Sequence, residues 1–205
     1  GGGLGEAALR QGNTAFSRLE AGEVTLSEQF SLEENFEQVR LPRFNSSGVI
    51  APTRLPIIDR GRWVNSLING RSAKEYGKAS NGANPEEAMR APAVAPGTLQ
   101  ESDILAALDT GLYVSNLHYL NWSDLNAGRI TGMTRYACFW VEQGEIVAPI
   151  ENLRFDDSLY RFLGEGLIGL SNQQTFVPAV GTYDQRSLGG MWVPGMLIEG
   201  FRYTL

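Results

Sequence analysis

Residues 110–155, TGLYVSNLHYLNWSDLNAGRITGMTRYACFWVEQGEIVAPIENLRF, determine the fold predicted for this chain. Residues 113–120 have the length and composition of a strand, and a polar segment comes after them. Residues 133–141 are apolar at odd and even positions alike, which predicts a central strand covered on both faces. A tight turn at residues 143–144 leads into a strand over residues 146–150. The stretch therefore predicts three successive strands, joined by a polar loop and then by a tight turn.

Upstream of this stretch the patterns are weaker and mix helix with strand. Helical spacing of apolar residues predicts helices, alternation predicts strands, and clusters of turn-forming residues predict loops. The expected elements are two short helical pieces within Glu6–Leu19, a strand over Val24–Leu32, a loop over Glu33–Asn45, a hairpin of Thr53–Asp59 and Arg62–Ile68 with a two-residue turn, a helix over Ser72–Tyr76 closed by Gly77, a mobile surface loop over Lys78–Met89 and an extended segment over Ala91–Pro96.

The remaining patterns complete an α+β fold. Thr98 and Glu101 have capping-box spacing, which predicts a helix that reaches Leu108 and is closed by Gly111. Further along, the expected elements are a short helix from Asp156-Asp157-Ser158 through Leu163 and one or two strands within Gly190–Leu205. Strands and helices do not alternate regularly and no repeat of fixed period occurs. The predicted fold class is therefore α+β, with a large, mainly antiparallel or mixed β-sheet and a few short helices.

Composition narrows the function classes. The 205 residues carry a net charge of −6 without a cluster of Lys or Arg, which argues against direct binding of nucleic acid. No apolar run reaches the ~18 residues of a membrane span, and no basic-then-apolar signal peptide opens the chain. A single cysteine, Cys138, excludes an internal disulfide and fits a reducing compartment. We therefore expect a cytoplasmic protein without a membrane partner. The glycine-rich start at residues 1–5 is explained either by a cloning remnant or by a fragment that begins inside a larger fold.

Three segments follow one another along the chain: Ser47–Ile50 leading to Arg71-Ser72-Ala73, Gly77 and Ser80-Asn81-Gly82; Ala95-Pro96-Gly97-Thr98 and then Gly111-Leu112-Tyr113-Val114; and Phe139–Ile146 with Pro149-Ile150. In order and spacing they resemble the TldD/PmbA family of bacterial and archaeal peptidase subunits, once described as modulators of DNA gyrase. The resemblance implies that residues 1–205 are a single C-terminal domain of this type, whose N-terminal part is absent.

The same resemblance bears on the metal site. Proteolytic members of the family carry a helix with HExxxH and a cysteine ligand near the C-terminus, which together hold zinc and leave a position open for water. Residues 13–28 resemble the segment on the C-terminal side of that helix, so the motif falls at or before Gly1 and Gly2. The cysteine-bearing segment corresponds to residues 181–184, where no cysteine occurs. The resemblance thus implies no catalytic and no metal-binding residue in this chain.

The leading hypothesis is therefore a subunit without metal in a peptidase complex that acts on unfolded peptides. It would pair as a homodimer, or as a heterodimer with a related metal-bearing subunit. Zinc would lie only in such a partner or in an upstream segment. Two alternatives stay open: a non-enzymatic assembly module, and a fragment of an active metallopeptidase whose HExxxH helix lies upstream. The peptide-binding residues are not identified, although any exposed strand edge could pair with an extended peptide.

His118 and Cys138 are the remaining candidates for catalysis. His118 is the only histidine, and a general acid–base or ligand role is possible; its place between Leu117 and Tyr119 favours a polar position on a half-buried strand. Cys138 lies in the most apolar strand, which favours an inert buried thiol. A Cys–His dyad would require that the two side chains meet.

Charged pairs, glycines and tryptophans have structural explanations as well. The acidic pairs Asp156-Asp157 and Glu33-Glu34 could hold a metal, but the first pair is better explained as a helix N-cap. Arg129 and Arg135 could clamp a substrate carboxylate, although solvated ion pairs are the simpler expectation. The segment 188–191 lacks the context of a phosphate-binding loop. Core and interface packing is the best explanation for the four tryptophans, Trp63, Trp122, Trp140 and Trp192.

Overall fold

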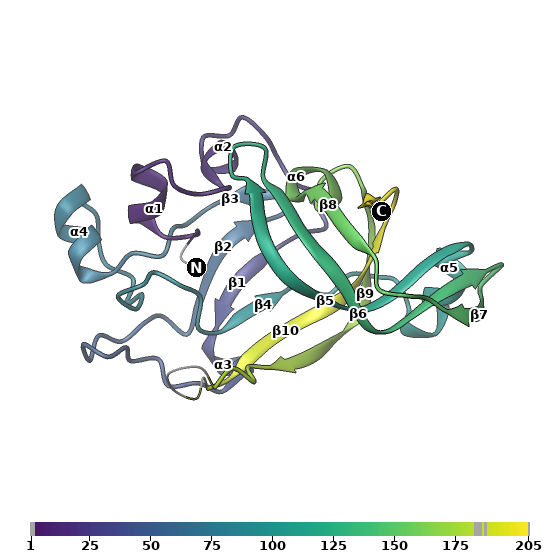
Figure 1. Ribbon diagram of the computed structural model, residues 1–205. Coiled ribbons are helices and arrows are strands. Elements are labelled where there is room, and N and C mark those ends of the chain that lie inside the picture. Colours follow the sequence, from purple (N-terminus) through teal and green to yellow (C-terminus); the bar gives the residue numbers. More distant parts are fainter. Residues whose placement is uncertain (1–2, 183–185, 187, 205) are drawn as a thin grey trace.

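The computed structural model describes residues 3–182, 186 and 188–204. Strands account for 41% of the chain and helices for 16%, arranged as two sheets with a few short helices, so the predicted α+β class is confirmed (Figure 1). No helix in these ranges is long and apolar enough to cross a membrane.

The first sheet has six strands in the order β3-β2-β1-β4-β10-β9. All neighbouring strands in it are antiparallel except the β4–β10 pair, which is parallel. The strands are β1 (Leu32–Asn35), β2 (Arg54–Asp59), β3 (Arg62–Trp63), β4 (Pro92–Val94), β9 (Leu167–Pro178) and β10 (Gly190–Ile198).

The second sheet is built on the long β5–β6 hairpin. Its order is β11-β8-β6-β5, and β7 pairs with β6 as well. In Figure 1 this hairpin crosses in front of the first sheet. Apolar side chains of both sheets share one core cluster, with Ile57 and Leu170 from the first and Ile130 from the second. The strands are β5 (Gly111–Asp124), β6 (Arg129–Glu142), β7 (Glu145–Pro149), β8 (Arg154–Ser158) and β11 (Tyr203–Thr204).

The helices are short. They are α1 (Glu6–Arg10), α2 (Ser17–Glu20), α3 (Phe36–Val39), α4 (Gly70–Tyr76), the 3-10 turn η1 (Glu101–Asp103), α5 (Ile104–Leu108) and α6 (Leu159–Phe162). The two helical pieces predicted at the start are α1 and α2. The predicted end of α4 at Gly77 is also confirmed, because Gly77 adopts a left-handed φ of 66°. At the other end, the Asn69 side chain accepts the N–H groups of Arg71 and Ser72.

Two tight turns also conform to the local sequence. Arg60 and Gly61 join β2 to β3 with φ of 45° and 75°, and Gln143 and Gly144 join β6 to β7 with φ of 51° and 78°. Two consecutive positive φ angles characterise the type I′ hairpin turn, which matches the twist of the strands. Gly61 is also required sterically, since a Cβ there would lie 2.2 Å from the Leu26 carbonyl oxygen.

Several predicted elements upstream of β2 are wrong. Residues 24–31 do not form a strand; Leu26 and Phe30 anchor this segment in the core, and strand pairing begins only at Leu32. The alternating apolar residues of this segment pack in the core, but the segment forms no strand-to-strand hydrogen bonds of a β-ladder. The predicted loop from Glu33 instead contains most of β1 and all of α3, because Asn35 caps that helix by accepting the Gln38 N–H at 3.0 Å.

The predicted capping box before α5 is also wrong. No side-chain hydrogen bond caps η1 or α5, and a 3-10 turn from Glu101 begins the helical segment. The helix does end at Leu108, but Asp109, with φ of 53°, terminates it, and Gly111 instead opens β5.

Three expectations for the second sheet are corrected. The polar segment after Leu120 continues β5 as far as Asp124, because it pairs with β6 across the hairpin. β6 is central but not covered on both faces, since Tyr136 is 67% exposed. Residues 156–158 end β8 rather than capping a helix, and α6 begins one residue later.

Candidate functional site

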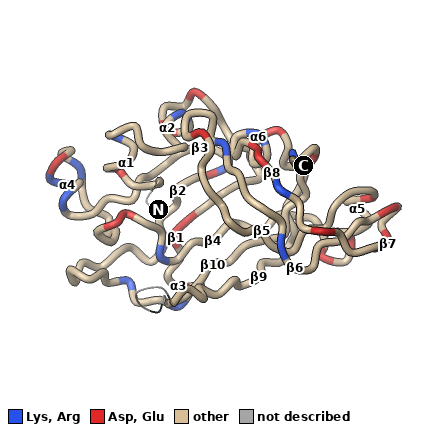
Figure 2. The backbone as a smooth tube through the Cα atoms, viewed as in Figure 1, with Lys and Arg blue, Asp and Glu red and all other residues tan. Residues whose placement is uncertain are grey.

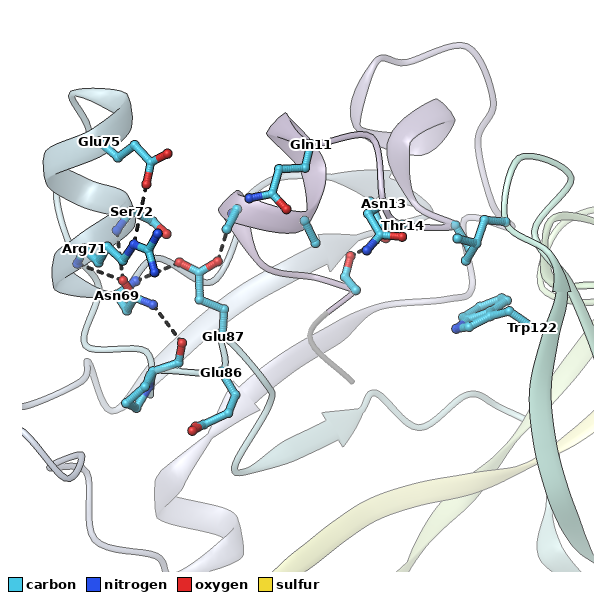
Figure 3. Close-up of a pocket in the computed structure, with 16 residues that line it drawn as sticks. Gln11, Asn13, Thr14, Asn69, Arg71, Ser72, Glu75, Glu86, Glu87 and Trp122 are labelled. Atoms are coloured by element: carbon cyan, nitrogen blue, oxygen red, sulfur yellow. Dashed lines mark hydrogen bonds and ion pairs between the residues drawn. The ribbon is translucent and has the colours of Figure 1, made fainter.

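A polar cavity of about 510 Å³ opens beside α1 (Figure 3). It lies between α1, the start of α4, the loop at residues 85–87 and the turn end of the β5–β6 hairpin. Its walls are formed by Gly3, Ala7, Ala8, Gln11, Asn13, Thr14, Ala15, Asn69, Arg71, Ser72, Glu75, Pro85, Glu86, Glu87, Trp122 and Leu125.

Glu87 joins the two helices that border this cavity. Its side chain lies between them in Figure 3, where it accepts the Ala7 N–H of α1 at 2.9 Å and the Asn69 N–H before α4 at 3.1 Å. The residue is 3% exposed and has a left-handed φ of 48°, stabilised by its own N–H donating to the Asn84 carbonyl. Both carboxylate oxygens are thus used at helix N-termini, where negative charge is favoured.

Glu6 is the second buried acid in the region around α1, which we call the α1 corner. It has no exposed surface, yet its Oε1 accepts hydrogen bonds from Arg10 Nε at 2.7 Å and Lys78 Nζ at 2.8 Å. Burial alone would raise the pKa of this carboxyl, but the hydrogen bonds from Lys78 and Arg10 outweigh burial and lower it. Glu6 is therefore held ionised by the donors at its Oε1, whereas its Oε2 is buried without a hydrogen-bond partner among the described residues.

The open polar groups of the cavity are carboxylates and amides. Glu75 and Glu86 line it, and Arg71 contributes one positive charge at 3.7 Å from Glu75. Neither the only histidine nor the only cysteine of the chain lies in its wall. Within the described ranges, no group of three His, Cys, Asp or Glu side chains could hold a metal ion.

The structure does not bring His118 and Cys138 together. In the β5–β6 ladder His118 pairs with Met133, whereas Cys138 pairs with Val114. His118 is exposed rather than half-buried, and Cys138 is 2% exposed, as expected of a buried thiol. Since the two side chains occupy different parts of the hairpin, they do not form a Cys–His dyad.

The acidic pair of β8 is structural, but not as a helix cap. Asp156 pairs with Arg129 at 2.7 Å, so the expected ion pair of Arg129 is confirmed. Asp157 is 1% exposed, binds the Arg161 guanidinium and accepts the Arg202 N–H at 3.0 Å. Burial opposes ionisation of Asp157, but these donors prevail and lower its pKa.

Of the two acids of β1, Glu33 is partly exposed and Glu34 is buried. Glu33 forms an ion pair with Arg54 at 2.8 Å. Glu34 is 3% exposed and accepts the N–H of Arg90 at 2.8 Å together with that of Ala91. Burial raises the pKa of Glu34, and the two N–H donors only partly oppose this shift. Neither residue faces a partner that suggests a metal site.

The other candidates also have structural contacts. Arg135 lies against His118 and over the Tyr136 ring at 4.1 Å, so the ion pair expected for it does not occur among the described residues. Gly189, with φ of 80°, packs close to Leu41 just before β10, which is no phosphate-binding loop. Tyr183 and Asp184, in the segment expected to match the cysteine region, lie outside the described residues.

Of the four tryptophans, Trp122 is exposed and the other three are only partly buried. Trp63 and Trp122 both contact the Phe16 ring, with centroids 6.1 and 6.2 Å away. The Trp192 indole donates to the Gln38 carbonyl at 3.2 Å, and the Trp140 indole donates to Glu142 at 2.7 Å. Trp122 has a further role that the sequence did not indicate, because its exposed side lines the cavity.

The outer edge of the first sheet offers a different kind of site. Residues 97–99 cover β9 at residues 170–172 through three main-chain hydrogen bonds. Beyond them, residues 174–178 pair in unbroken register with β10 and have no other strand beside them in the described structure. Ala179 N–H donates to the Gly189 carbonyl, so by alternation the main-chain groups of Phe176 face the open edge.

Comparisons with known proteins identify the family. A family model described as the PmbA/TldA metallopeptidase C-terminal domain matches residues 1–204. The chain belongs to the PmbA/TldD family. No curated protein matches its sequence significantly. The TldD/PmbA resemblance noted in the sequence is thereby confirmed.

Solved structures agree on the fold. TldE from Thermococcus kodakarensis superposes with a TM-score of 0.76 at 19% identity, over 99% of this chain and 46% of that one. A candidate modulator of a DNA gyrase from Thermotoga maritima gives 0.76 at 15%, over 98% and 45%. One from Bacteroides thetaiotaomicron gives 0.73 at 17%, over 98% and 42%. The chain thus spans less than half the length of these structures.

Proposed function

We propose that the chain is the C-terminal domain of a metal-free subunit in a PmbA/TldD-type peptidase complex that acts on unfolded peptides. The composition of α1 carries this proposal. Residues 5–10, GEAALR, have the spacing of HExxxH, with glycine and arginine at the two histidine positions. In this proposal α1 is the counterpart of the metal helix, whereas residues 13–28 led us to expect that helix at or before Gly2.

The side chains around α1 do not fit a zinc ion. Gly5 offers no ligand, and Arg10 cannot give up its proton to become one. The one retained acid, Glu6, already accepts hydrogen bonds from Arg10 and Lys78. A divalent cation here would meet two positive charges where a zinc site presents neutral imidazoles. Zinc therefore belongs, in this proposal, to a metal-bearing partner.

The peptide site proposed for this domain is the open edge of β9. An extended chain can add a strand to such an edge through main-chain hydrogen bonds. The free residues 174–178 are in regular register with β10, which leaves their outward groups evenly spaced. The exposed side chains of Phe176 and Val177 offer apolar contacts beside that edge.

The wider setting comes from the family. We propose that residues 1–205 form one domain of a longer chain, since the similar solved structures are more than twice as long. Pairing with a second copy or with a related metal-bearing subunit would complete the complex. The single cysteine, Cys138, supports a cytoplasmic location.

Metal analysis tests the first part of this proposal. The purified chain is dialysed against micromolar zinc and then against buffer, and bound zinc is measured by plasma mass spectrometry. We expect no stoichiometric zinc. Retention of one zinc per chain, lost in Glu6→Gln but not in the surface variant Glu75→Gln, contradicts the proposal.

Peptide binding tests the second part. The probe is a fluorescein-labelled unstructured peptide rich in Thr and Val, monitored by fluorescence anisotropy. Phe176→Pro removes the outward N–H and should weaken binding about tenfold or more, because Pro blocks an edge strand. Phe176→Ala is the matched control, since it removes the same ring but keeps the N–H. Equal loss in both variants would show that the main chain is not the contact.

An assembly module without peptide binding is the second candidate. The broad apolar surface of the β5–β6 hairpin favours it, because such surfaces mark contacts between folded proteins. Absence of saturable peptide binding, alone or with a metal-bearing relative, would favour this alternative. A complete HExxxH in the native sequence upstream would instead favour the third candidate, a fragment of an active metallopeptidase.

A further inference from the structure

Arg135 is the one charged side chain in the middle of the β5–β6 hairpin, within residues 111–123 and 130–141. On the next strand Arg154 pairs with Met133, two residues before Arg135, so the two arginines are diagonal neighbours on one face of the second sheet. In Figure 2 both β6 and β8 carry a blue segment on this sheet. Side chains in this relation have Cβ atoms roughly 7–8 Å apart, so both guanidinium groups can contact one ligand.

This face of the second sheet points to solvent. Thr134 and Phe155, which alternate with the two arginines along β6 and β8, are each 1% exposed and form the inner face. Arg154 is exposed and Arg135 is half-buried. The exposed His118 pairs with Met133 and so lies on the same outward face. We call the surface formed by His118, Arg135 and Arg154 the arginine face.

The two positive charges of the arginine face are not compensated within the described ranges. Neither arginine forms an ion pair with a carboxylate there, and Asp156, two residues along β8, is already paired with Arg129 at 2.7 Å. Like charges on neighbouring strands repel each other and destabilise the sheet. In a chain of net charge −6, such a pair of cations indicates a ligand that brings negative charge.

Neutral groups hold Arg135 in place. Its guanidinium lies over the Tyr136 ring, 4.1 Å from the centroid, and its Nη1 donates to a ring nitrogen of His118 at 3.0 Å. These contacts restrict the side chain but leave its charge unpaired. A guanidinium held in this way can donate two parallel hydrogen bonds to a carboxylate, and it loses little conformational freedom when the ligand binds.

We propose that the arginine face binds the acidic side chains of an extended peptide, with one carboxylate on Arg135 and a second on Arg154. Alternate side chains of an extended chain lie on one side of it, about 7 Å apart, which matches the diagonal spacing of the two arginines. The ligand class is therefore a peptide with Asp or Glu at alternate positions. This inference rests on the proposed function only for the expectation that the chain binds unfolded peptides, and it adds a second contact outside the β9 edge.

Fluorescence anisotropy with two labelled peptides tests this inference. Both peptides are unstructured and equally long; one carries Asp at alternate positions, and the other carries Asn at the same positions. The wild-type chain should bind the Asp peptide about tenfold more tightly or better, the effect of one hydrogen-bonded charge pair. The double variant Arg135→Gln, Arg154→Gln should lose this preference. The control double variant Arg62→Gln, Lys74→Gln removes the same total charge at exposed sites on β3 and α4 and should keep it.

Three results would overturn the inference. They are equal affinity of the wild-type chain for the two peptides, a preference that survives in the arginine double variant, and a preference that the control variant loses as well. Full displacement of the Asp peptide by an equal concentration of inorganic phosphate would show a general anion site and overturn the peptide assignment. If the arginine double variant does not fold, the single variant Arg154→Gln changes only an exposed side chain, and an unchanged preference in it overturns the inference.

The variant Phe176→Pro separates this inference from the proposed function. It changes the β9 edge in the first sheet and should leave the preference for the Asp peptide intact. If this variant binds the peptide rich in Thr and Val as well as the wild-type chain does, the β9 edge is not the peptide site, and the arginine face is still tested by the ratio of the two affinities. If the preference disappears in Phe176→Pro, the acidic peptide uses the β9 edge and the arginine face is excluded.

Discussion

The corner around α1 and the β5–β6 hairpin use side chains in opposite ways. At α1, two buried acids, Glu6 and Glu87, are matched one by one with guanidinium, ammonium and N–H donors. The hairpin has almost no charge and leaves aromatic and aliphatic groups in water. In the first region the acids are paired within the chain, except for Glu6 Oε2, which is buried without a hydrogen-bond partner in the part of the chain that the structure describes. In the second region apolar side chains are exposed to water, which favours their burial by association.

The largest effect on stability is expected from Glu6→Gln. The substitution keeps the volume but leaves Arg10 and Lys78 beside a neutral amide in a site without solvent exposure. Loss of one partner from a buried ion pair costs roughly 3–5 kcal/mol, and the remaining exposure of the two cations places this variant near the lower figure. Urea unfolding measures the change. A loss below ~1 kcal/mol would show that the corner depends on packing rather than on charge.

The pH dependence of stability should come from the same corner and from Asp157. Both carboxyls have pKa values lowered by their donors, despite burial. The stabilisation is therefore complete above the unfolded pKa values of about 4 and is lost as the pH falls through them toward the folded values. The midpoint of urea unfolding should decline below about pH 5. A Glu6→Gln, Asp157→Asn variant should show a flatter profile; an unchanged slope would assign it to other groups.

A smaller effect is expected at Glu87. Glu87→Gln keeps one acceptor oxygen but replaces the other with an NH₂ group, which cannot accept from Ala7 or Asn69. The expected loss is about 1–2 kcal/mol, the cost of one unsatisfied buried donor. Hydrogen exchange should quicken at both of these amides, at the starts of α1 and α4. Glu86→Gln, next along the chain and in the cavity wall, is the control and should leave both rates unchanged.

The smallest effect is expected from Tyr136→Ser. Because Tyr136 is 67% exposed, its removal should change the unfolding free energy of the monomer by no more than about 0.5 kcal/mol. Measurement at nanomolar concentration separates this value from any contribution of association. A large loss in the dilute monomer would mean that the ring supports the hairpin itself, and the contrast with the α1 corner would then disappear.

Elements encoded by nearby residues were predictable. The two-residue turns at Arg60-Gly61 and Gln143-Gly144, and the cap of α4 by Gly77, depend only on backbone conformations that these residues favour. The segment 24–31 shows the limit of this approach. Its alternating apolar residues suit a strand, but a strand forms only where a neighbouring strand is available for pairing. Here Leu26 and Phe30 are instead buried in the hydrophobic core without strand pairing.

The site was predictable only in part. The spacing of GEAALR, the single histidine and the single cysteine are properties of the sequence, and together they define which ligands this chain can offer. The role of Glu87 was not evident, because it depends on the Ala7 N–H eighty residues away. Likewise, the apolar run at residues 133–141 predicted a buried Tyr136, but in the structure this side chain is 67% exposed because no layer covers it. Local sequence sets backbone preference and the available chemistry, whereas burial and partnership come from contacts between distant segments, which only the folded chain brings together.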